Sequence, residues 1–478
     1  MANCAFCGRK LPAFTLSKKC QWCVQHEAAQ RGEDAGVQRV EVAPWLRTQS
    51  TSMVVTQGIF GINVAVFIAM VLALGAAMLE NPGGQDLANW GANYGPYTVS
   101  GQWWRLLTCV FLHGSLLHIA FNMWCLWDLG RLTESLYGHW TFACVYLISG
   151  ISASVASIVW NPGVLSVGAS GAIFGLAGAL ISSYYLGEFS MPRAVIAGTL
   201  RSVVIFVGFN LFLGGVMART DNGAHVGGLV MGLILGALIA KVAPAQDDIG
   251  RRVAVLLIGA LLVTGGVFWL YRSHAYLAHG RKGADLLDQG KVNEAIAELQ
   301  KTVTLRPNFA AGHATLSRAY VRAHDYEHAA IEMQRVIELS PQSEDARYRL
   351  GLIYLELKDP AKAEDVFGQL LKMNAGNADG HAGMAAALSD QHRNAEALEE
   401  YKRVAAIDAG YDGINYNLGV QQARLKQYDD AIASLLKQRE AGDDPDNENL
   451  LAAVYENKGM QKEAADAKAR AAQMQDQK

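Results

Sequence analysis

The sequence is poor in charge and in cysteine. Asp, Glu, Lys and Arg make up 18% of its 478 residues, and the net charge is -3. Such a balance provides no concentrated basic face, which argues against a nucleic-acid partner. All seven cysteines precede residue 145, so the last third needs no disulfides. Residues 1–30 also lack the apolar core of a signal peptide, and we expect the first hydrophobic span to serve as an uncleaved membrane signal.

What the sequence does have is a long apolar middle, roughly residues 58–272, between two polar ends. Seven runs in it approach the ~20 residues needed to cross a bilayer core. They are 58–79, 107–128, 140–160, 169–187, 200–217, 223–241 and 253–271. Buried helices of a soluble domain seldom stay apolar for so long. The pattern therefore predicts an all-α polytopic membrane bundle.

The positions of Lys and Arg predict the orientation of these spans, since positive charge is enriched on the cytosolic side. One side carries Arg39, Arg47, Arg131, Arg193, Arg201, Lys241, Arg251 and Arg252, and the other carries Arg105 and Arg219. We therefore expect an inner plasma membrane protein with a cytosolic N-terminus. Seven spans then place the C-terminal third outside the cytoplasm. One span more or fewer would reverse the side of that tail.

Four cysteines near the N-terminus form the pattern C-x2-C-x12-C-x2-C: Cys4, Cys7, Cys20 and Cys23. Two such pairs can place four thiolates tetrahedrally around one Zn²⁺, and Gly8 suits the tight turn after the first pair. The alternatives are structural disulfides, which a reducing cytosol disfavours, and redox chemistry, for which one pair would suffice. We predict a structural zinc ribbon over residues 1–30, followed by a linker over 31–57.

Four polar residues stand inside the apolar block, where placement costs free energy: His118, Asn122, Ser170 and His225. A lone membrane serine usually bonds to its own helix, and a single histidine can serve helix packing. The predicted topology, however, puts the starts of spans four and six on the same side, so Ser170 and His225 reach a similar depth. Together they supply a nucleophile and a general base. His118 and Asn122 share one helical face and offer donors for an oxyanion.

Small residues support a close approach of spans four and six, because they let helix backbones pack tightly. Span four carries Gly171 and Gly175, and span six carries Gly228 and Gly232. The ordered polar and glycine motifs resemble the rhomboid family of intramembrane serine proteases over about 58–241, with the last span as the appended helix of a 6+1 arrangement. The matching stretches are Gly101-Gln-Trp-Trp-Arg105, His113-x4-His118-x3-Asn122, Gly130-Arg131-x2-Glu134, Gly168-x-Ser-Gly171 and Ala224-His-x2-Gly228-x3-Gly232.

The resemblance implies a protease domain over 58–272 that needs no catalytic cofactor. Ser170 would attack the scissile carbonyl, and His225 would take and return its proton. The oxyanion hole would consist of His118, Asn122 and the backbone amide of Ser170. Phe174 would lie against the catalytic imidazole. The substrates would be transmembrane proteins cut within or near the outer leaflet of the lipid bilayer.

The resemblance also assigns Trp104 and Arg105 a structural role in a loop that lies partly in the membrane. No acidic residue is evident as a third triad member, and we expect Asp221, four residues before His225, to be a solvated loop residue. Position 172 is alanine, so the G-x-S-x-G elbow of α/β-hydrolases is absent. A Ser-His dyad is therefore predicted. The alternatives are a catalytically inactive rhomboid-like membrane adaptor and a transporter, which would not explain the ordered motifs.

The last third, residues 273–478, repeats with a fixed period, since Ala295 and Ala329 are 34 residues apart. The alanines in this phase are Ala295, Ala329, Ala363, Ala397, Ala431 and Ala465, and large residues follow four positions later in most copies. This period is typical of tetratricopeptide repeats, whereas a generic helical bundle has no reason for it. We expect the divergent last copy to cap the stack. Such an array predicts a protein or peptide ligand and no catalysis of its own.

Overall fold

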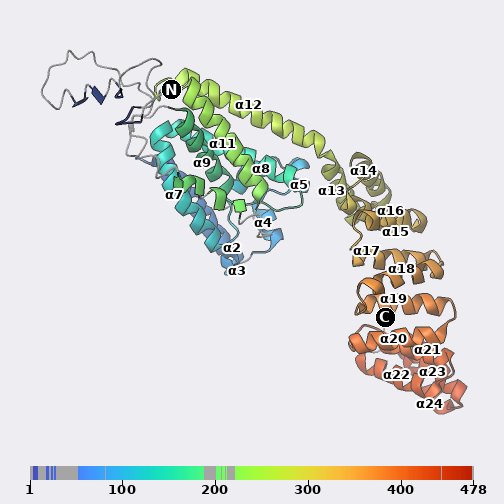
Figure 1. Cartoon of the computed structure of the whole chain (residues 1–478). Coiled ribbons are helices and arrows are strands. Elements are labelled where there is room, and N and C mark those ends of the chain that lie inside the picture. The colour runs from blue at the N-terminus through green and yellow to red at the C-terminus, as the bar shows by residue number, and fades with distance from the viewer. Residues whose placement is uncertain are drawn as a thin grey trace. The chain divides into compact units, whose positions relative to one another are not determined.

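The computed structural model describes residues 4–8, 18–20, 23–24, 26–27, 52–80, 82–187, 201–205, 207–209, 211–212, 221–442 and 444–475. Within these residues the fold is all-α, with a single isolated β-bridge and no strand. The chain divides into two compact units, Met1–Arg281 and Lys282–Lys478 (Figure 1). The predicted membrane bundle followed by a helical repeat domain is confirmed. The predicted linker over 31–57 lies mostly outside the described residues, and the predicted domain bounds stay a prediction.

Six described helices of at least 17 residues in the first unit overlap predicted spans: α2 (Val54–Leu74), α7 (Leu116–Tyr137), α8 (His139–Trp160), α9 (Ser170–Leu186), α11 (Asn222–Val242) and α12 (Ile249–Ser273). Of these, α2, α8, α11 and α12 are long and apolar enough to cross a membrane, and α7 gives a fifth crossing if the bent stretch before it is included. The apolar α9 is shorter, with 17 residues. Of the predicted span 200–217, residues 201–205, 207–209 and 211–212 are helical, and the rest lies outside the described residues.

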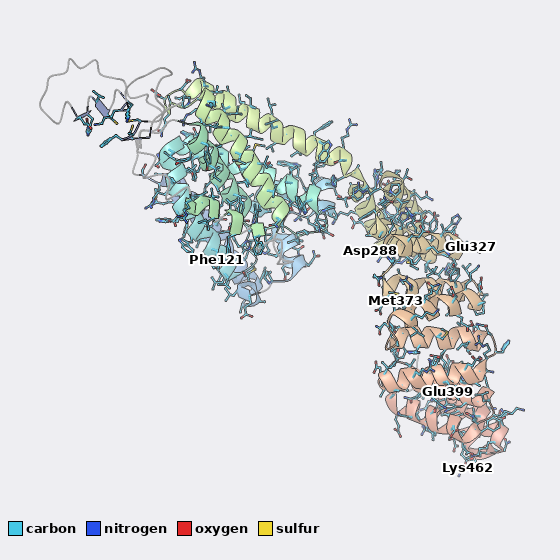
Figure 2. All side chains as sticks on the ribbon, in the orientation of Figure 1. Phe121, Asp288, Glu327, Met373, Glu399 and Lys462 are labelled. Atoms are coloured by element: carbon cyan, nitrogen blue, oxygen red, sulfur yellow. The ribbon has the colours of Figure 1, made fainter. Side chains whose placement is uncertain are left out.

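The residues exposed on the two units differ in kind, and Figure 2 labels examples on each unit. The bundle exposes large apolar residues, such as Phe121 on α7 at 60%. The repeat unit instead exposes charged residues, including Glu327, Glu399 and Lys462. An apolar outer surface suits contact with lipid chains, so the first unit is an integral membrane domain.

The predicted second span, 107–128, is wrong in its bounds. Helix α7 begins only at Leu116, because Ser115 takes an extended conformation and its side chain accepts a hydrogen bond from the His118 amide at 3.2 Å. The stretch before it, Arg105–Phe111, is bent from α7 by 91°. This stretch consists of α6 (Arg105–Thr108) and the 3-10 helix η1 (Cys109–Phe111). With α3 (Ala77–Glu80), α4 (Gly84–Trp90) and α5 (Gly95–Val99), it forms the α2–α7 connection.

The closest helix pair in the bundle is α9 with α11. A Cβ atom added to Gly228 would overlap the carbonyl oxygen of Gly171, and one added to Gly232 would overlap that of Gly175. Glycine at these positions lets the two backbones touch. The close approach of these two helices, expected from their small residues, is confirmed. It positions the first turns of both helices, which carry the candidate catalytic residues.

The buried carboxylate of Glu134, near the end of α7, holds the start of α2. Its two oxygens accept hydrogen bonds from the backbone amides of Val55 at 3.0 Å and Thr56 at 2.8 Å. The first amides of a helix have no partner within the helix and carry partial positive charge. Glu134 therefore accepts hydrogen bonds from two of these amides and offsets their positive charge. This gives a physical role to the last residue of the motif Gly130-Arg131-x2-Glu134.

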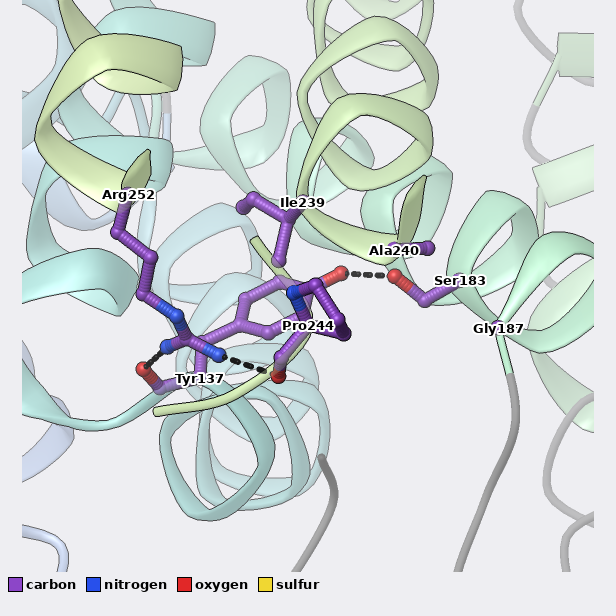
Figure 3. A pocket seen from close by; sticks show the side chains of 7 residues that line it. All are labelled: Tyr137, Ser183, Gly187, Ile239, Ala240, Pro244 and Arg252. Carbon is purple, nitrogen blue, oxygen red and sulfur yellow. Dashed lines mark hydrogen bonds between the residues drawn. The ribbon is translucent and has the colours of Figure 1, made fainter. Parts of the chain in front are cut away.

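At the start of α12, the buried guanidinium of Arg252 donates hydrogen bonds to the C-terminal ends of two other helices (Figure 3). It donates to the carbonyl of Tyr137 at the end of α7, and to those of Ala243 at 3.2 Å and Pro244 at 3.0 Å, just after α11. The Tyr137 hydroxyl continues the network, with 2.6 Å to the Ser183 hydroxyl of α9. Helix C-termini carry partial negative charge, so they stabilise the buried cation together with the nearby carboxylates of Asp247 and Asp248.

The second unit is a stack of helix pairs that begins with α13 (Ala275–Asp288), whose first residues belong to the first unit. The helices that follow are α14 (Val292–Leu305), α15 (Ala310–Arg322), α16 (Tyr326–Leu339), α17 (Glu344–Glu356), α18 (Pro360–Met373), α19 (Ala378–Asp390), α20 (Asn394–Ile407), α21 (Ile414–Arg424), α22 (Tyr428–Ala441), α23 (Pro445–Lys458) and α24 (Gln461–Gln475). The first five periodic alanines are fully buried. In the sixth copy the prediction is wrong by one residue, because Ala464 is buried and Ala465 is exposed.

The turns within the helix pairs share an unusual backbone conformation. His324, Lys358, His392 and Lys426 all have positive φ, between 57° and 63°. They lie 34 residues apart, so the same position of each repeat adopts the left-handed conformation. In the first repeat this position is Gly290, with φ 76°. Residues with a Cβ atom pay a steric penalty in this conformation.

Candidate active site and metal site

The pairing of α9 with α11 brings Ser170 and His225 together. Ser170 is the first residue of α9, and His225 lies in the first turn of α11. The Nε2 atom of His225 lies 3.0 Å from the Oγ atom of Ser170. His225 is buried, with 6% of its surface exposed, and Ser170 is half-buried. A hydroxyl within hydrogen-bonding distance of an imidazole is the geometry in which a base can take the hydroxyl proton.

The imidazole of His225 is fixed by an aromatic ring. Phe174, one turn after Ser170, stacks on it with a centroid distance of 4.2 Å and an angle of 1° between the planes. Among the described residues, the Nδ1 atom of His225 has no hydrogen-bond partner. Asp221 makes no hydrogen bond to it. The expectation of a solvated loop residue is wrong, because Asp221 is partly buried and caps α11 by accepting from the Ala224 amide at 2.9 Å.

His118 and Asn122 both face the backbone just before Ser170. A Cβ atom added to Gly168 would lie 2.8 Å from Nε2 of His118 and 3.6 Å from Nδ2 of Asn122. Gly168 has φ 123°, a conformation that residues with a side chain rarely adopt. The absence of a side chain therefore leaves room for both nitrogen atoms beside the segment that leads to Ser170.

The tautomer of His118 follows from its surroundings. The amide of Gly114 donates to its Nδ1 atom at 3.4 Å, so Nδ1 is the acceptor and the ring proton resides on Nε2. Nε2 is the atom that faces Gly168, and it can therefore donate there. The side-chain amide of Asn122 donates to the carbonyl of His118 at 3.1 Å. Two N–H groups thus lie beside Gly168, two residues before Ser170, where they fit the donors of an oxyanion site.

Arg105 organises the α2–α7 connection. Its buried guanidinium donates to the carbonyls of Ala88 at 2.5 Å and Ala92 at 2.9 Å, and it stacks over the ring of Trp104 at 4.7 Å. These contacts join Arg105 to Ala88, Ala92 and Trp104, and none of them involves Ser170. The structural role expected for this pair agrees with this geometry.

Sequence reasoning missed Asn93, which is fully buried in the α2–α7 connection. Its backbone forms the isolated bridge with Ser166, with hydrogen bonds of 3.0 and 2.8 Å. Ser166 lies four residues before Ser170. The only signal in the sequence is a polar residue between Gly91 and Gly95, which is common in loops.

The four N-terminal cysteines come together as predicted from their spacing. The sulfur atoms of Cys4, Cys7, Cys20 and Cys23 all lie within 4.8 Å of one another. Gly8, with φ 75°, follows the first pair at the turn. Hydrogen bonding from backbone amides, chiefly that of Cys7, lowers the pKa of Cys4 to about 6, whereas burial raises the pKa of Cys23. The fit to a tetrahedral metal ion therefore rests on the closeness of the four sulfur atoms, since cysteine binds metals as the thiolate.

Comparison with known proteins agrees with this architecture. A model of the rhomboid domain matches residues 100–242, and two models of tetratricopeptide repeats match 281–344 and 323–387. Rhomboid protease GluP of Bacillus subtilis is 31% identical over 300 residues, which cover 61% of this chain and 57% of that protein. Rhomboid protease AarA of Providencia stuartii is 29% identical over 226 residues, 42% of this chain and 78% of that protein.

The chain spans only about half the length of the first curated relatives, 57% of one and 51% of the next. Among solved structures, YrrB, a TPR protein with an unusual peptide-binding site, is similar with 20% identity and a TM-score of 0.31. That similarity covers 34% of this chain and 84% of YrrB. The matches to family models confirm the two resemblances on which the sequence analysis depended. The chain therefore carries a rhomboid domain followed by tetratricopeptide repeats.

Proposed function

We propose that this protein is an intramembrane serine endopeptidase, with Ser170 as the nucleophile and His225 as the general base. The observation that carries the proposal is the 3.0 Å separation of Ser170 Oγ and His225 Nε2 inside an apolar helical bundle. The presence of a rhomboid domain and relatives named rhomboid proteases support the same activity. The substrates are transmembrane proteins.

In the first step, Ser170 Oγ bonds to the carbonyl carbon of the scissile peptide while its proton moves to His225 Nε2. The oxygen of the tetrahedral intermediate receives hydrogen bonds from His118 Nε2, Asn122 Nδ2 and the Ser170 amide. When the C–N bond breaks, His225 gives its proton to the leaving nitrogen. Water then bonds to the acyl carbon while one of its protons moves to His225 Nε2, and the bond from that carbon to Ser170 Oγ breaks as the imidazole returns the proton to the serine oxygen. Phe174 keeps the imidazole oriented throughout, and its π-face favours the imidazolium form.

The substrate helix has to unwind near the cut, because a helical backbone hides its carbonyls in hydrogen bonds. Small or helix-breaking residues near the scissile bond are therefore expected. The proposed orientation in the plasma membrane has a cytosolic N-terminus. Ser170, His225 and the repeat array then face the extracytoplasmic side, so the cut is made in the outer leaflet.

Substitution of the two central residues tests the activity. Ser170→Ala and His225→Ala should each abolish cleavage of a transmembrane reporter by purified protein. Within one catalytic unit, the loss of either member costs nearly as much activity as the loss of both. Ser182→Ala is a matched control, because the partners of this hydroxyl among the described residues are carbonyls of its own helix, Gly178 and Ala179. Asn122→Ala should retain activity reduced by about 100- to 1000-fold, the effect of losing one oxyanion donor.

A fluorophosphonate probe tests the same proposal without a substrate. The probe should modify wild-type protein at Ser170 and leave Ser170→Ala unlabelled. Full cleavage by Ser170→Ala would refute the protease mechanism. Absence of both labelling and cleavage in folded wild-type protein would favour the alternative, a catalytically inactive membrane adaptor.

For the repeat array we propose capture of a protein or peptide, either a substrate or an adaptor, which raises its local concentration near the active site. Deletion of residues 283–478 should weaken cleavage of native partners and spare a short transmembrane peptide. A cysteine introduced into the array of a cysteine-free chain should react with an impermeant maleimide on intact cells. Reaction only after lysis would place the array in the cytosol and refute this model.

For the four N-terminal cysteines we propose a structural zinc ion. Four thiolates leave no open coordination position, so the metal has no part in peptide cleavage. The site belongs to the cytosolic end of the chain in the proposed orientation, across the membrane from Ser170. Its function is therefore to fold the N-terminal segment.

A further inference from the structure

The segment that leads into Ser170 is held by the α2–α7 connection. The amide of Asn93 donates to the carbonyl of Ser166 at 3.0 Å, and the amide of Ser166 donates back at 2.8 Å. Two residues later, the amide of Gly168 donates to the carbonyl of Cys109 at 2.9 Å. The backbone between Ser166 and Ser170 is thus fixed from outside its own helix. This backbone includes Gly168, beside which His118 and Asn122 lie.

The side chain of Asn93 in turn fixes the backbone that makes this bridge. Its Nδ2 atom donates to the carbonyl of Ser154 in α8 at 2.8 Å, and its Oδ1 atom accepts from the Thr98 hydroxyl at 2.8 Å. Both Asn93 and Thr98 are fully buried. In a low-dielectric interior, such fully satisfied hydrogen bonds specify one geometry. Asn93 is therefore tied to α5, to α8 and to the segment before Ser170.

The chain of contacts extends to the last span. The hydroxyl of Tyr271, near the end of α12, donates to the carbonyl of Thr98 at 2.8 Å. The neighbouring ring of Tyr97 packs against two guanidinium groups, Arg105 at 4.9 Å and Arg281 at 3.9 Å. The α5 helix is thus held from the side of α12 and α13 as well as from within the connection. These contacts serve no step of the proposed mechanism directly.

We infer that Asn93 is a positioning residue for the nucleophile, and that Tyr271 of the appended span supports it through Thr98. This inference rests on the proposed function of Ser170. Asn93 touches neither the substrate nor the reacting atoms. It sets the backbone path from Ser166 to Gly168, and that path determines where the Ser170 hydroxyl and amide stand relative to His225 and the oxyanion donors. Helix α12 thereby contributes to the position of the nucleophile.

The test measures how fast a fluorophosphonate probe labels Ser170 in full-length purified protein. Asn93→Ala should lower the rate constant by about 10- to 100-fold, as expected for a displacement of about 1 Å at a reacting group. Thr98→Val and Tyr271→Phe each remove one hydroxyl and should lower it by about threefold to tenfold, the range for one hydrogen bond. Thr98→Ser, which retains the hydroxyl, should restore the rate.

The final amplitude of labelling separates positioning from general stability. A loss of folded protein would lower the amplitude and leave the rate constant of the remaining molecules unchanged, whereas displacement of Ser170 lowers the rate at full amplitude. Thr264→Val is the matched control, because this α12 hydroxyl bonds only to Ala260 of its own helix. Unchanged rate constants in Asn93→Ala, Thr98→Val and Tyr271→Phe would overturn the inference. Wild-type protein that is not labelled at Ser170 would instead refute the proposed function.

Discussion

Replacement of Gly228 by alanine should separate α9 from α11 and thereby disable the site. The added Cβ atom would overlap the carbonyl oxygen of Gly171, the residue next to Ser170, far inside the 3.0 Å that such contacts tolerate. The helices have to move apart by on the order of 1 Å to relieve this overlap, and overpacking of this kind costs about 1–3 kcal/mol. The distance from Ser170 Oγ to His225 Nε2 would grow from 3.0 Å to about 4 Å, beyond hydrogen-bonding range. Cleavage should fall about 100-fold.

The assay combines cleavage of a transmembrane reporter with thermal unfolding of the same purified protein. Gly61→Ala is the matched control, because a Cβ atom at this α2 glycine meets no atom within 4 Å. That variant should keep full activity, and its helix should gain on the order of 0.5–1 kcal/mol from the loss of a flexible glycine. Wild-type cleavage and stability in Gly228→Ala would refute the argument that backbone contact between α9 and α11 positions the two residues.

Two further predictions concern the ends of the chain. Purified protein should contain about one zinc ion per chain, and replacement of Cys4 and Cys7 by serine should remove it. Metal analysis of both proteins checks this, and immediate loss of cleavage on zinc removal would show that the metal is regulatory. His392→Gly should stabilise the repeat array by about 0.5–1 kcal/mol, because glycine relieves the left-handed backbone at φ 63°. Lys402→Gly, in the middle of α20, should destabilise it by about 1 kcal/mol. Denaturant unfolding of the array distinguishes these outcomes, and a loss of stability in His392→Gly would contradict the strain argument.

Much of the candidate site could be predicted because membrane placement makes polar residues informative. Ser170 and His225 stand in apolar runs, and the glycines beside them indicate where two backbones touch. The period of the alanines similarly predicts the repeat array, since each buried alanine marks the same contact between paired helices. In the last copy the buried alanine is Ala464, one residue before the position that the 34-residue period predicts. There α23 ends at Lys458 and is capped by Gly459, with φ 84°, one residue earlier than the spacing of the preceding turns would place this residue.

The features that could not be predicted depend on the backbone. The start of α7 was misplaced because hydropathy does not detect a cap such as Ser115, and the apolar stretch continues through the bend. The bridge from Asn93 to Ser166 leaves no side-chain pattern, because backbone amides and carbonyls form it. Asp221 looks like a loop residue in the sequence, since a helix cap and a solvated aspartate have the same composition signal.

The guanidinium of Arg252 has a consequence for the biosynthesis of the protein. Its acceptors are carbonyls at the ends of α7 and α11, so they exist as a group only after both helices have formed and met. While the chain is being inserted, α12 carries a cation whose partners have to be assembled first. Docking of α12 is therefore expected to follow the meeting of α7 with α11. A failure of α7 or α11 to fold would leave the Arg252 guanidinium without part of this set of carbonyl acceptors.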